Sequence, residues 1–386
     1  MKSEWKIIRA ADFMEFNPRM NLKKGTIATK ISMDKLQPYT KKIPETEQAE
    51  FSGGTKFSNG DTIMARITPC LENGKTAFVD CLNKDEVAFG STEFIVLRAK
   101  PGVSDAQFVY YLATSPEFRQ VAIKSMVGSS GRQRVQQPVL ENLELVVPEL
   151  PKQKRIGGFL AAIDDKIALN AKINDNLLRQ AQALYKDRFI DLKPFNGKMP
   201  SEWQLGTVSE IIELHDSKRI PLSSRERANL RKIYPYYGAT SVMDYVDRYL
   251  FDGIYLLLGE DGTVVDDKGF PILQYVEGKF WVNNHAHIIT GKNGFTVETL
   301  YLLFSLTNVR SIVTGAVQPK ISQANLNNVS VVIPSKAELS TFNSIVQPIF
   351  SQIRNLRAES DRLTTTRDIL LPRLMSGEID AANIQL

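Results

Sequence analysis

The stretch GRQRVQQPVLENLELVVP (Gly131–Pro148) recurs in altered form as AVQPKISQANLNNVSVVIP (Ala316–Pro334). When the two stretches are aligned on their final prolines, residues 186 positions apart share their character. The matched positions are Arg134 with Lys320, Val135 with Ile321, and Leu140 with Leu326. Self-similarity at a fixed spacing is typical of an internal structural repeat, so we expect the neighbouring segments to repeat as well.

Segments upstream of this stretch are also repeated. Trp5 opens WKIIRAADFM, and Trp203 opens WQLGTVSEII. The segment FGSTEFIVLR (Phe89–Arg98) lies opposite WVNNHAHIIT (Trp281–Thr290), and each has an aromatic residue followed by an apolar strand-like run. We therefore interpret the chain as two copies of one unit, each a globular domain followed by a long helix.

The two long helices are predicted from an apolar seam that follows each repeated proline with steps of four and three residues. The first seam is Ile156, Leu160, Ile163, Ile167, Asn170, Asn174, Leu177, Ala181 and Leu184. The second is Phe342, Val346, Ile349, Ile353, Leu356, Ser360, Leu363, Arg367 and Leu370. A seam spaced 3.5 residues on average needs a partner helix, and the other copy is the nearest one available. We expect an antiparallel coiled coil of two helices, each about 35 residues or ~50 Å long.

The ends of these helices have recognisable signals. Ser335 and Glu338 form a predicted capping box at the second start, and Pro151 suits the first turn of the earlier helix. Lys193-Pro194 should stop the first helix, and Pro372 should end or kink the second.

Two asparagines interrupt the first seam at positions where the second seam has Leu356 and Ser360. A buried asparagine at such a position commonly fixes the register of a coiled coil at some cost in stability. The alternative is that Asn170 and Asn174 both face solvent where the helices separate.

The globular halves are predicted to be mixed α/β (α+β). Strand-like runs are DTIMARIT, TAFVDC and EFIVLR in the first copy, and GIYLLLG, HAHIIT and VSVVI in the second. A helix is predicted from Ser104, with Gln107 completing a capping box, to about Met126, and a matching one from Thr296 to about Arg310. The predicted segments are a first globular domain (1–149), a first long helix (150–192), a second globular domain (193–334), and a second long helix with its tail (335–386).

Composition restricts the class of protein. The chain has 386 residues, 43% of them hydrophobic, with a formal net charge of +5, which permits nucleic acid as a partner without demanding it. No apolar run is long enough to span a membrane. The N-terminal MKSEWKII lacks the apolar core of a signal peptide, and two cysteines suit a reducing compartment, so we expect a cytoplasmic protein.

Catalytic and metal-binding motifs are missing from the sequence. NGKT (residues 73–76) resembles the end of a phosphate-binding loop, but Pro69 stands where the first glycine is required. No glycine-rich S-adenosylmethionine loop and no Asn-Pro-Pro-aromatic tetrad is present. His285 and His287 are interpreted as a polar pair at a groove or strand end, since no carboxylate or thiol partners can be identified. GEDG (residues 259–262) is interpreted as an acidic turn and not a magnesium site. We expect a protein without catalytic residues, metal or cofactor.

Planar hydrogen-bond donors are instead concentrated in a few segments. Arginine matches the guanine edge and glutamine the adenine edge, while serine and lysine suit phosphates. The alternatives are solvated polar loops and, for Tyr236, a packed tyrosine. The candidate DNA-binding residues are Ser129, Ser130, Arg132, Gln133 and Arg134 in one loop; Gln318, Lys320 and Gln323 in its counterpart; Arg66, Asn73 and Lys75 around a turn; and Arg227, Arg231, Lys232 and Tyr237 before Gly238.

In several long sequence segments the chain resembles the specificity subunit of type I restriction-modification systems. The resemblance is carried by RITPCLENGKTAF, PYYGATSVMDYVDRYLFDGIYLLLGEDG, AIDDKIALNAKINDNLLRQAQALYKDRF and ILLPRLMSGEID, which span nearly the whole chain. One departure is SQIRNLRAESDRL in the second helix, which lacks the asparagine-rich string of the first.

The resemblance implies a non-catalytic subunit that reads double-stranded DNA. Such subunits bind two modification (methyltransferase) subunits and two restriction (translocase/nuclease) subunits. S-adenosylmethionine, ATP and magnesium are then expected on those partners only. The resemblance implies that the globular domains 1–149 and 193–334 are target recognition domains, each reading one half of a bipartite, asymmetric target. The two long helices would then be spacers that act as a ruler. A competing interpretation is an assembly adaptor that recruits partners through its helices without binding DNA. A further one is an enzyme whose site is assembled from dispersed residues.

Overall fold

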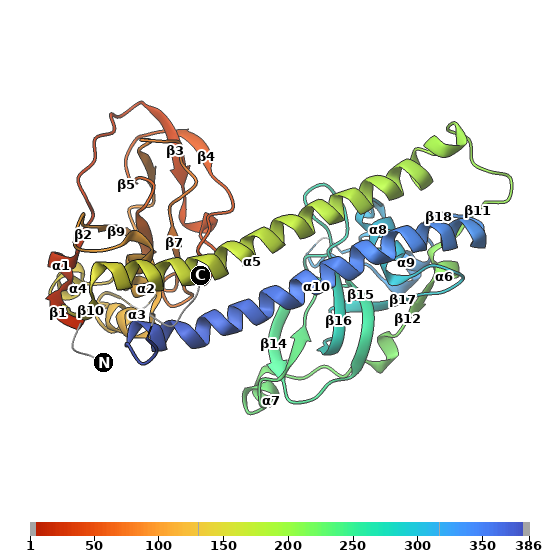
Figure 1. Cartoon of the computed structure of the whole chain (residues 1–386). Coiled ribbons are helices and arrows are strands. Elements are labelled where there is room, and N and C mark those ends of the chain that lie inside the picture. The colour runs from red at the N-terminus through yellow and green to blue at the C-terminus, as the bar shows by residue number, and fades with distance from the viewer. Residues whose placement is uncertain (1–4, 130, 316, 381–386) are drawn as a thin grey trace. The chain divides into compact units, whose positions relative to one another are not determined.

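The computed structural model describes residues 5–129, 131–315 and 317–380. It divides into two compact units, of which unit 1 comprises Met1–Ala171 with Arg357–Leu386 and unit 2 comprises Lys172–Leu356. Both long helices, α5 (Leu150–Tyr185) and α10 (Lys336–Met375), contribute a part to each unit (Figure 1). The compact units therefore cut across the four segments predicted from the sequence, because each globular domain packs on portions of both helices.

Unit 1 contains two four-stranded sheets and a two-stranded ribbon. The sheets have the orders β2-β9-β6-β7 and β4-β3-β8-β5, and the ribbon pairs β1 with β10 antiparallel. The strands are β1 Trp5–Arg9, β2 Met14–Phe16, β3 Ile27–Ile31, β4 Glu47–Glu50, β5 Thr55–Phe57, β6 Thr62–Ala65, β7 Thr76–Phe78, β8 Ala88–Gly90, β9 Phe94–Ala99 and β10 Glu144–Pro148. The short helices are α1 Ala10–Phe13, α2 Ala106–Thr114, α3 Pro116–Lys124 and α4 Gln137–Glu141.

Unit 2 contains a six-stranded sheet, of order β12-β17-β15-β16-β13-β14, and a ribbon that pairs β11 with β18. The strands are β11 Gln204–Thr207, β12 Ile212–Leu214, β13 Tyr234–Tyr237, β14 Val242–Val246, β15 Phe251–Gly259, β16 Leu273–Val282, β17 Ala286–Gly291 and β18 Ser330–Ile333. The helices are α6 Val208–Ile211, α7 Ser224–Ala228, α8 Val297–Ser305 and α9 Gln323–Asn327. In the described part of the chain, no helix combines the length and apolar character needed to cross a membrane.

Central strands in both units are buried on both faces, which explains their continuous apolar sequences. In β9, Ile95 packs in one core and Val96 in another. In β15, Leu256 and Leu257 alternate between two cores in the same way. Successive side chains of a strand point to opposite faces of its sheet. In each unit one face therefore packs in a core with the helices, and the other face packs in a separate core.

The predicted repeat and the mixed α/β fold are confirmed. The order β1–α1–β2 of the first copy returns as β11–α6–β12, and β10 and β18 close equivalent ribbons. Phe13 and Ile211, which the tryptophan alignment places opposite each other, end equivalent short helices and are fully buried.

The two long helices run antiparallel, as each unit shows separately. In unit 1, Ile156 near the start of α5 shares a core with Leu374 near the end of α10. In unit 2, the ring of Tyr185 at the end of α5 lies 5.7 Å from that of Phe342 near the start of α10. The start of each helix therefore packs with the end of the other.

Most of the predicted seam is buried or half-buried, but Leu184 is exposed and that prediction is wrong. The buried face instead continues from Ala181 to Tyr185 and Phe189. An α-helix has 3.6 residues per turn, so a strict 3.5-residue pattern drifts around it over several turns. Ile167, Leu177, Leu363 and Leu370 are half-buried, while Ile156, Leu160, Ile163, Val346, Ile353 and Leu356 are buried.

The solvent-facing alternative for the two asparagines is wrong for Asn170. This side chain is 0% exposed, and its Nδ2 donates to Oε2 of Glu359 at 2.8 Å and to the Ser360 hydroxyl at 3.3 Å. Asn174 is half-buried. The polar pairing of Asn170 with α10 is consistent with a register-fixing role.

Helix ends follow the predicted signals in part. Ser335 caps α10 by accepting from the amide of Glu338, and Pro151 lies in the first turn of α5. After α5 a π-helical turn ends at Ile190, before Lys193-Pro194. However, α10 continues through Pro372 to Met375. In a last turn, proline removes only one intrahelical bond, so it does not stop the helix there.

The helix predicted from Ser104 to about Met126 is two helices. Asp105, and not Ser104, caps α2 by accepting from the Phe108 amide at 3.0 Å. Ser115 ends α2 and caps α3, whose first residue is Pro116. The matching helix α8 is capped by Thr296 as predicted but ends at Ser305, before Arg310.

A buried polar triad attaches the globular part of unit 1 to both long helices. Arg367 of α10 donates to Asp164 of α5 at 2.6 Å, and the Tyr111 hydroxyl of α2 donates to the same carboxylate at 2.5 Å. Burial and then the charge of Asp164 raise the pKa of Tyr111, which keeps the hydroxyl protonated as a donor. Unit 2 has an analogous triad of Arg354, Glu298 and Tyr275.

We predict that Arg367→Met destabilises the protein by about 3–5 kcal/mol, because Asp164 then remains buried without its cation. Urea denaturation followed by fluorescence measures the change. Arg362→Met, at an exposed position on the same helix, is the control and should stay within about 0.5 kcal/mol of wild type. Equal destabilisation by the two variants would contradict a special role for the triad.

Candidate nucleic-acid interface

The first polar loop, residues 127–134, is tied to the end of strand β6. Val127 and Arg134 exchange backbone hydrogen bonds of 3.1 and 2.9 Å, and Arg134 also forms a bridge with Ile67. The next residue, Val135, is fully buried, and its amide donates to the Arg66 carbonyl at 2.9 Å. The base of the loop is thus held by backbone hydrogen bonds and by the buried side chain of Val135.

The second polar loop, residues 314–320, has the same construction. Thr314 and Lys320 exchange backbone hydrogen bonds of 2.9 and 2.8 Å, and Lys320 forms a bridge with Asp261 after β15. Ile321 follows, fully buried, with its amide donating to the Glu260 carbonyl at 2.9 Å. The predicted match of Arg134 with Lys320 and Val135 with Ile321 is therefore also a structural match.

The second residue of each loop is a glycine that no other residue could replace without strain. Gly128 has φ +137° and Gly315 has φ +87°, both in the region that L side chains avoid. A Cβ on Gly128 would lie 2.9 Å from the Arg132 carbonyl oxygen, and one on Gly315 would lie 2.3 Å from that of Gln318. Both loops therefore depend on close approach of the backbone at this point.

A carboxylate binds the basic residue at the base of each loop. The Glu93 carboxylate accepts from Nη2 of Arg134 at 2.6 Å and from its Nε at 3.0 Å. Glu260 lies 3.2 Å from Nζ of Lys320. The Arg134 hydrogen bonds lower the pKa of Glu93 against the opposing effect of burial. The Arg134–Glu93 pair is therefore charged at neutral pH.

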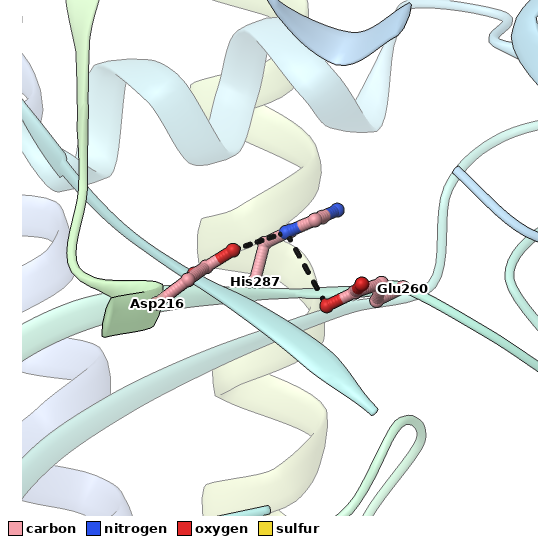
Figure 2. Close-up of side chains that lie close together, drawn as sticks. All are labelled: Asp216, Glu260 and His287. Carbon is pink, nitrogen blue, oxygen red and sulfur yellow. Dashed lines mark hydrogen bonds and ion pairs between the residues drawn. The ribbon is translucent and has the colours of Figure 1, made fainter. Parts of the chain in front are cut away.

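The second loop is further anchored by a buried cluster of Asp216, Glu260 and His287 (Figure 2). His287 Nδ1 lies 2.6 Å from Asp216 Oδ2 and 3.7 Å from Glu260 Oε2, while Nε2 lies 2.8 Å from the Ile321 carbonyl oxygen. Gln323, at the start of α9 after the loop, donates to Asp216 at 2.6 Å. The cluster thus connects β17 and the end of β15 to the segment that follows the loop.

Electrostatic balance within this cluster favours anchoring over metal binding. Asp216, Glu260 and His287 place ligand atoms within 4.8 Å of one another. However, both ring nitrogens of His287 already face oxygen atoms, and Arg219 contacts Glu260 at 2.5 Å. Burial raises the pKa of Asp216 and is the largest single effect, but the hydrogen bond and charge of His287, the amide of Ile288 and the charge of Arg219 together outweigh it, so the net pKa is lowered. The existing cations and donors therefore satisfy the carboxylates.

The sequence interpretation missed the carboxylate partners of these histidines. Asp216 lies 71 residues before His287 without a recognisable motif. Glu260 belongs to the GEDG segment, which begins the connection between the antiparallel strands β15 and β16, and Asp261 pairs with His285. No local spacing signal links these positions.

Of the three candidates in the unit 1 turn, which are Arg66, Asn73 and Lys75, only some lie beside the first loop. Arg66 Nη2 donates to the Val135 carbonyl at 3.3 Å, at the base of the loop. Lys75 instead points its Nζ to the Met33 carbonyl at 2.9 Å, and Asn73 is exposed. Arg66 is therefore the member of this group that the structure brings to the loop.

In the cluster before Gly238 in unit 2, two of the three cations share one carboxylate. Asp244 accepts from Arg227 at 3.0 Å and from Lys232 at 2.8 Å. The hydrogen bond from Lys232, then that from the Tyr245 amide and that from Arg227, lower the pKa of Asp244 to about 2. Arg227 also lies over the ring of Tyr236, whose burial confirms the packed-tyrosine alternative. Arg227 and Lys232 are therefore part of a folded ion-pair cluster in which both cations share the Asp244 carboxylate.

The remaining candidates are distributed as follows. Tyr237 packs edge-on against Phe280. Ser130 lies outside the described residues. Gln133 is half-buried, and the exposed candidates are Ser129, Arg132, Arg231 and Gln318. Their contacts with DNA stay predictions.

We predict that Asp216→Asn lowers stability at pH 7 by on the order of 3 kcal/mol, because His287 and Arg219 lose a buried anion. The folded-state pKa of Asp216 lies below its ordinary value of 3.8, so its stabilisation is present above that pH and is lost as the pH falls through the folded pKa. Thermal denaturation of wild type and variant between pH 3 and 7 should therefore show a difference that narrows in acid. A difference that is constant with pH would count against this assignment.

Comparison with known proteins identifies the family. A family model described as type I restriction modification DNA specificity domain matches residues 2–179 and 200–365. The type I restriction enzyme MjaIX specificity subunit of Methanocaldococcus jannaschii is 24% identical, over 71% of this chain and 69% of its own length. The type I restriction enzyme HindI specificity subunit of Haemophilus influenzae is 22% identical, over 84% of this chain and 87% of its own length.

A solved structure has the same fold. The crystal structure of the type I restriction-modification system S subunit from M. genitalium matches with a TM-score of 0.57 and 17% identity, covering 96% of each chain. Because the family model matches both halves of the chain, with their repeated loops and helices, this protein belongs to the type I restriction modification DNA specificity family.

Proposed function

We propose that this chain reads a bipartite, asymmetric DNA target, with one half-site recognised by each repeat. The observation that carries this proposal is the recurrence of one loop construction in both units, with different side chains at its exposed positions. Arg132 is exposed in the first loop and Gln318 in the second. Because arginine and glutamine match different base edges, the two half-sites should differ.

Binding combines two kinds of contact. Lysine and arginine side chains at phosphates supply affinity that falls with salt, and a few side chains at base edges select the sequence. The net charge of +5 is small for the length of the chain, and many of its cations are paired. A weak overall field supports selectivity over indiscriminate binding.

The chain is proposed to act as a non-catalytic, cytoplasmic subunit that assembles with modification and restriction subunits. Family membership supports this assembly. S-adenosylmethionine, ATP and magnesium are assigned to those partners. Aliphatic side chains of the long helices that remain exposed offer apolar surface for such partners, and they are Leu169, Leu184, Ile345 and Ile369.

We predict that replacing residues 1–149 with the corresponding domain of another family member changes only one half of the target, because α5 and α10 remain intact. Sequencing of methylated DNA from cells that express the chimaera with the modification subunit reads out the target. The matched control replaces residues 193–334 and should change only the other half. Methylation of altered bases in both halves by either chimaera, or methylation without sequence preference, would contradict the proposal.

A further inference from the structure

The side chain of Arg134 is held along one edge and is open along another. Glu93 accepts from Nε and Nη2, which occupies the side of the guanidinium nearest the chain. Among the described residues, Nη1 has no hydrogen-bond partner. The Arg134 side chain is 47% exposed, whereas Glu93 is 23% exposed. The outer edge of the guanidinium, between Nη1 and Nη2, is therefore available to a ligand while Glu93 holds the inner edge.

Glu93 is itself held firmly. Its backbone amide donates a hydrogen bond to the Ser91 hydroxyl at 3.1 Å, within the turn before β9. Its carbonyl accepts from the Arg66 amide at 2.9 Å, and the next residue, Phe94, is buried. Glu93 is thus anchored on both sides, by the strand that supports the loop base and by the core.

An exposed ion pair of this kind contributes little to the stability of the fold. Its main effect is on how the Arg134 side chain binds a ligand. A long arginine loses rotamer freedom when it binds a base, and prior orientation reduces that cost. The negative charge also offsets the attraction of Arg134 for phosphates, which lack sequence information. Both effects favour a base edge over the backbone as the partner of this arginine.

We propose that Arg134 is a specificity-determining residue that reads the O6/N7 edge of a guanine, and that Glu93 is its positioning residue. The inference rests on the proposed function of reading DNA. The planar fork of arginine matches the two adjacent acceptors of guanine in the major groove, and this is the commonest specific contact to that base.

The second unit limits the inference to one half-site. Lys320 occupies the position of Arg134 and pairs with Glu260, so the carboxylate recurs but the fork does not. A lysine ammonium is a point charge with no planar, bidentate geometry. The guanine contact therefore belongs to unit 1, and the loop base of unit 2 is suited to a single acceptor.

The test uses the full chain assembled with its modification subunits, on a target first mapped by methylation. Each guanine of the half-site that depends on residues 1–149 is replaced in turn by 7-deazaguanine, which lacks the N7 acceptor. For wild type, one replacement should weaken binding about 5- to 150-fold. Arg134→Ala should weaken binding to the natural duplex by a similar factor and should no longer respond to that replacement. Arg134→Lys should not restore the response.

Glu93→Gln tests the positioning role by a readout that loss of structure would not produce. It should reduce the penalty of 7-deazaguanine while raising affinity for non-cognate duplexes, because Arg134 gains both freedom and net attraction for phosphates. Arg19→Ala, at another exposed arginine of unit 1, is the control and should leave the 7-deazaguanine penalty as in wild type. Thermal denaturation of each variant checks that the fold is retained.

Several outcomes would overturn the inference. These are a half-site without guanine, a wild-type complex indifferent to 7-deazaguanine, a penalty that persists in Arg134→Ala, or a Glu93→Gln complex identical to wild type. If wild type shows sequence preference in any of these cases, only the inference fails. If wild type binds all duplexes alike, the proposed function itself fails.

Discussion

Neither long helix can bury its apolar face without the other, and this mutual requirement organises the whole chain. Ile156 of α5 shares a core with Leu374 of α10 in unit 1, and Tyr185 packs on Phe342 in unit 2. Polar side chains of the two helices also pair with each other, as in Asp164 with Arg367 and Asn170 with Glu359. Each globular part is therefore assembled on pieces of chain that are far apart in the sequence, and in unit 1 Asp164 and Arg367 are separated by 203 residues.

The repeated loops show how one scaffold can present different chemistry. A glycine of positive φ, a backbone pair and a buried aliphatic residue define the base of each loop, and these features recur in both units. The exposed positions between them are free to vary, because they make little contribution to packing. Scaffold and readout are thus carried by different residues, which suits a family whose members must differ in sequence specificity while keeping one fold.

The surface proposed to bind DNA, a polyanion, contains several carboxylates that pair with its basic side chains. Glu93, Glu260 and Asp244 each pair with a cation that the sequence alone would assign to DNA. Such pairing reduces indiscriminate attraction and orients the cation. It also means that a count of basic residues in a segment overstates how many are available to a ligand.

The sequence by itself determined the repeat, the fold class and the two long helices, because these depend on local periodicity and on a constant spacing along the chain. Capping by Ser335 and the first-turn position of Pro151 followed from neighbouring residues alone. The tertiary structure decided which side chains meet. Arg134 and Glu93 are 41 residues apart, and Asp216 and His287 are 71 apart, so no local pattern joins them. It also decided the exposure of Leu184, since an α-helix turns slightly less per residue than a 3.5-residue seam requires and brings Tyr185 to the buried face.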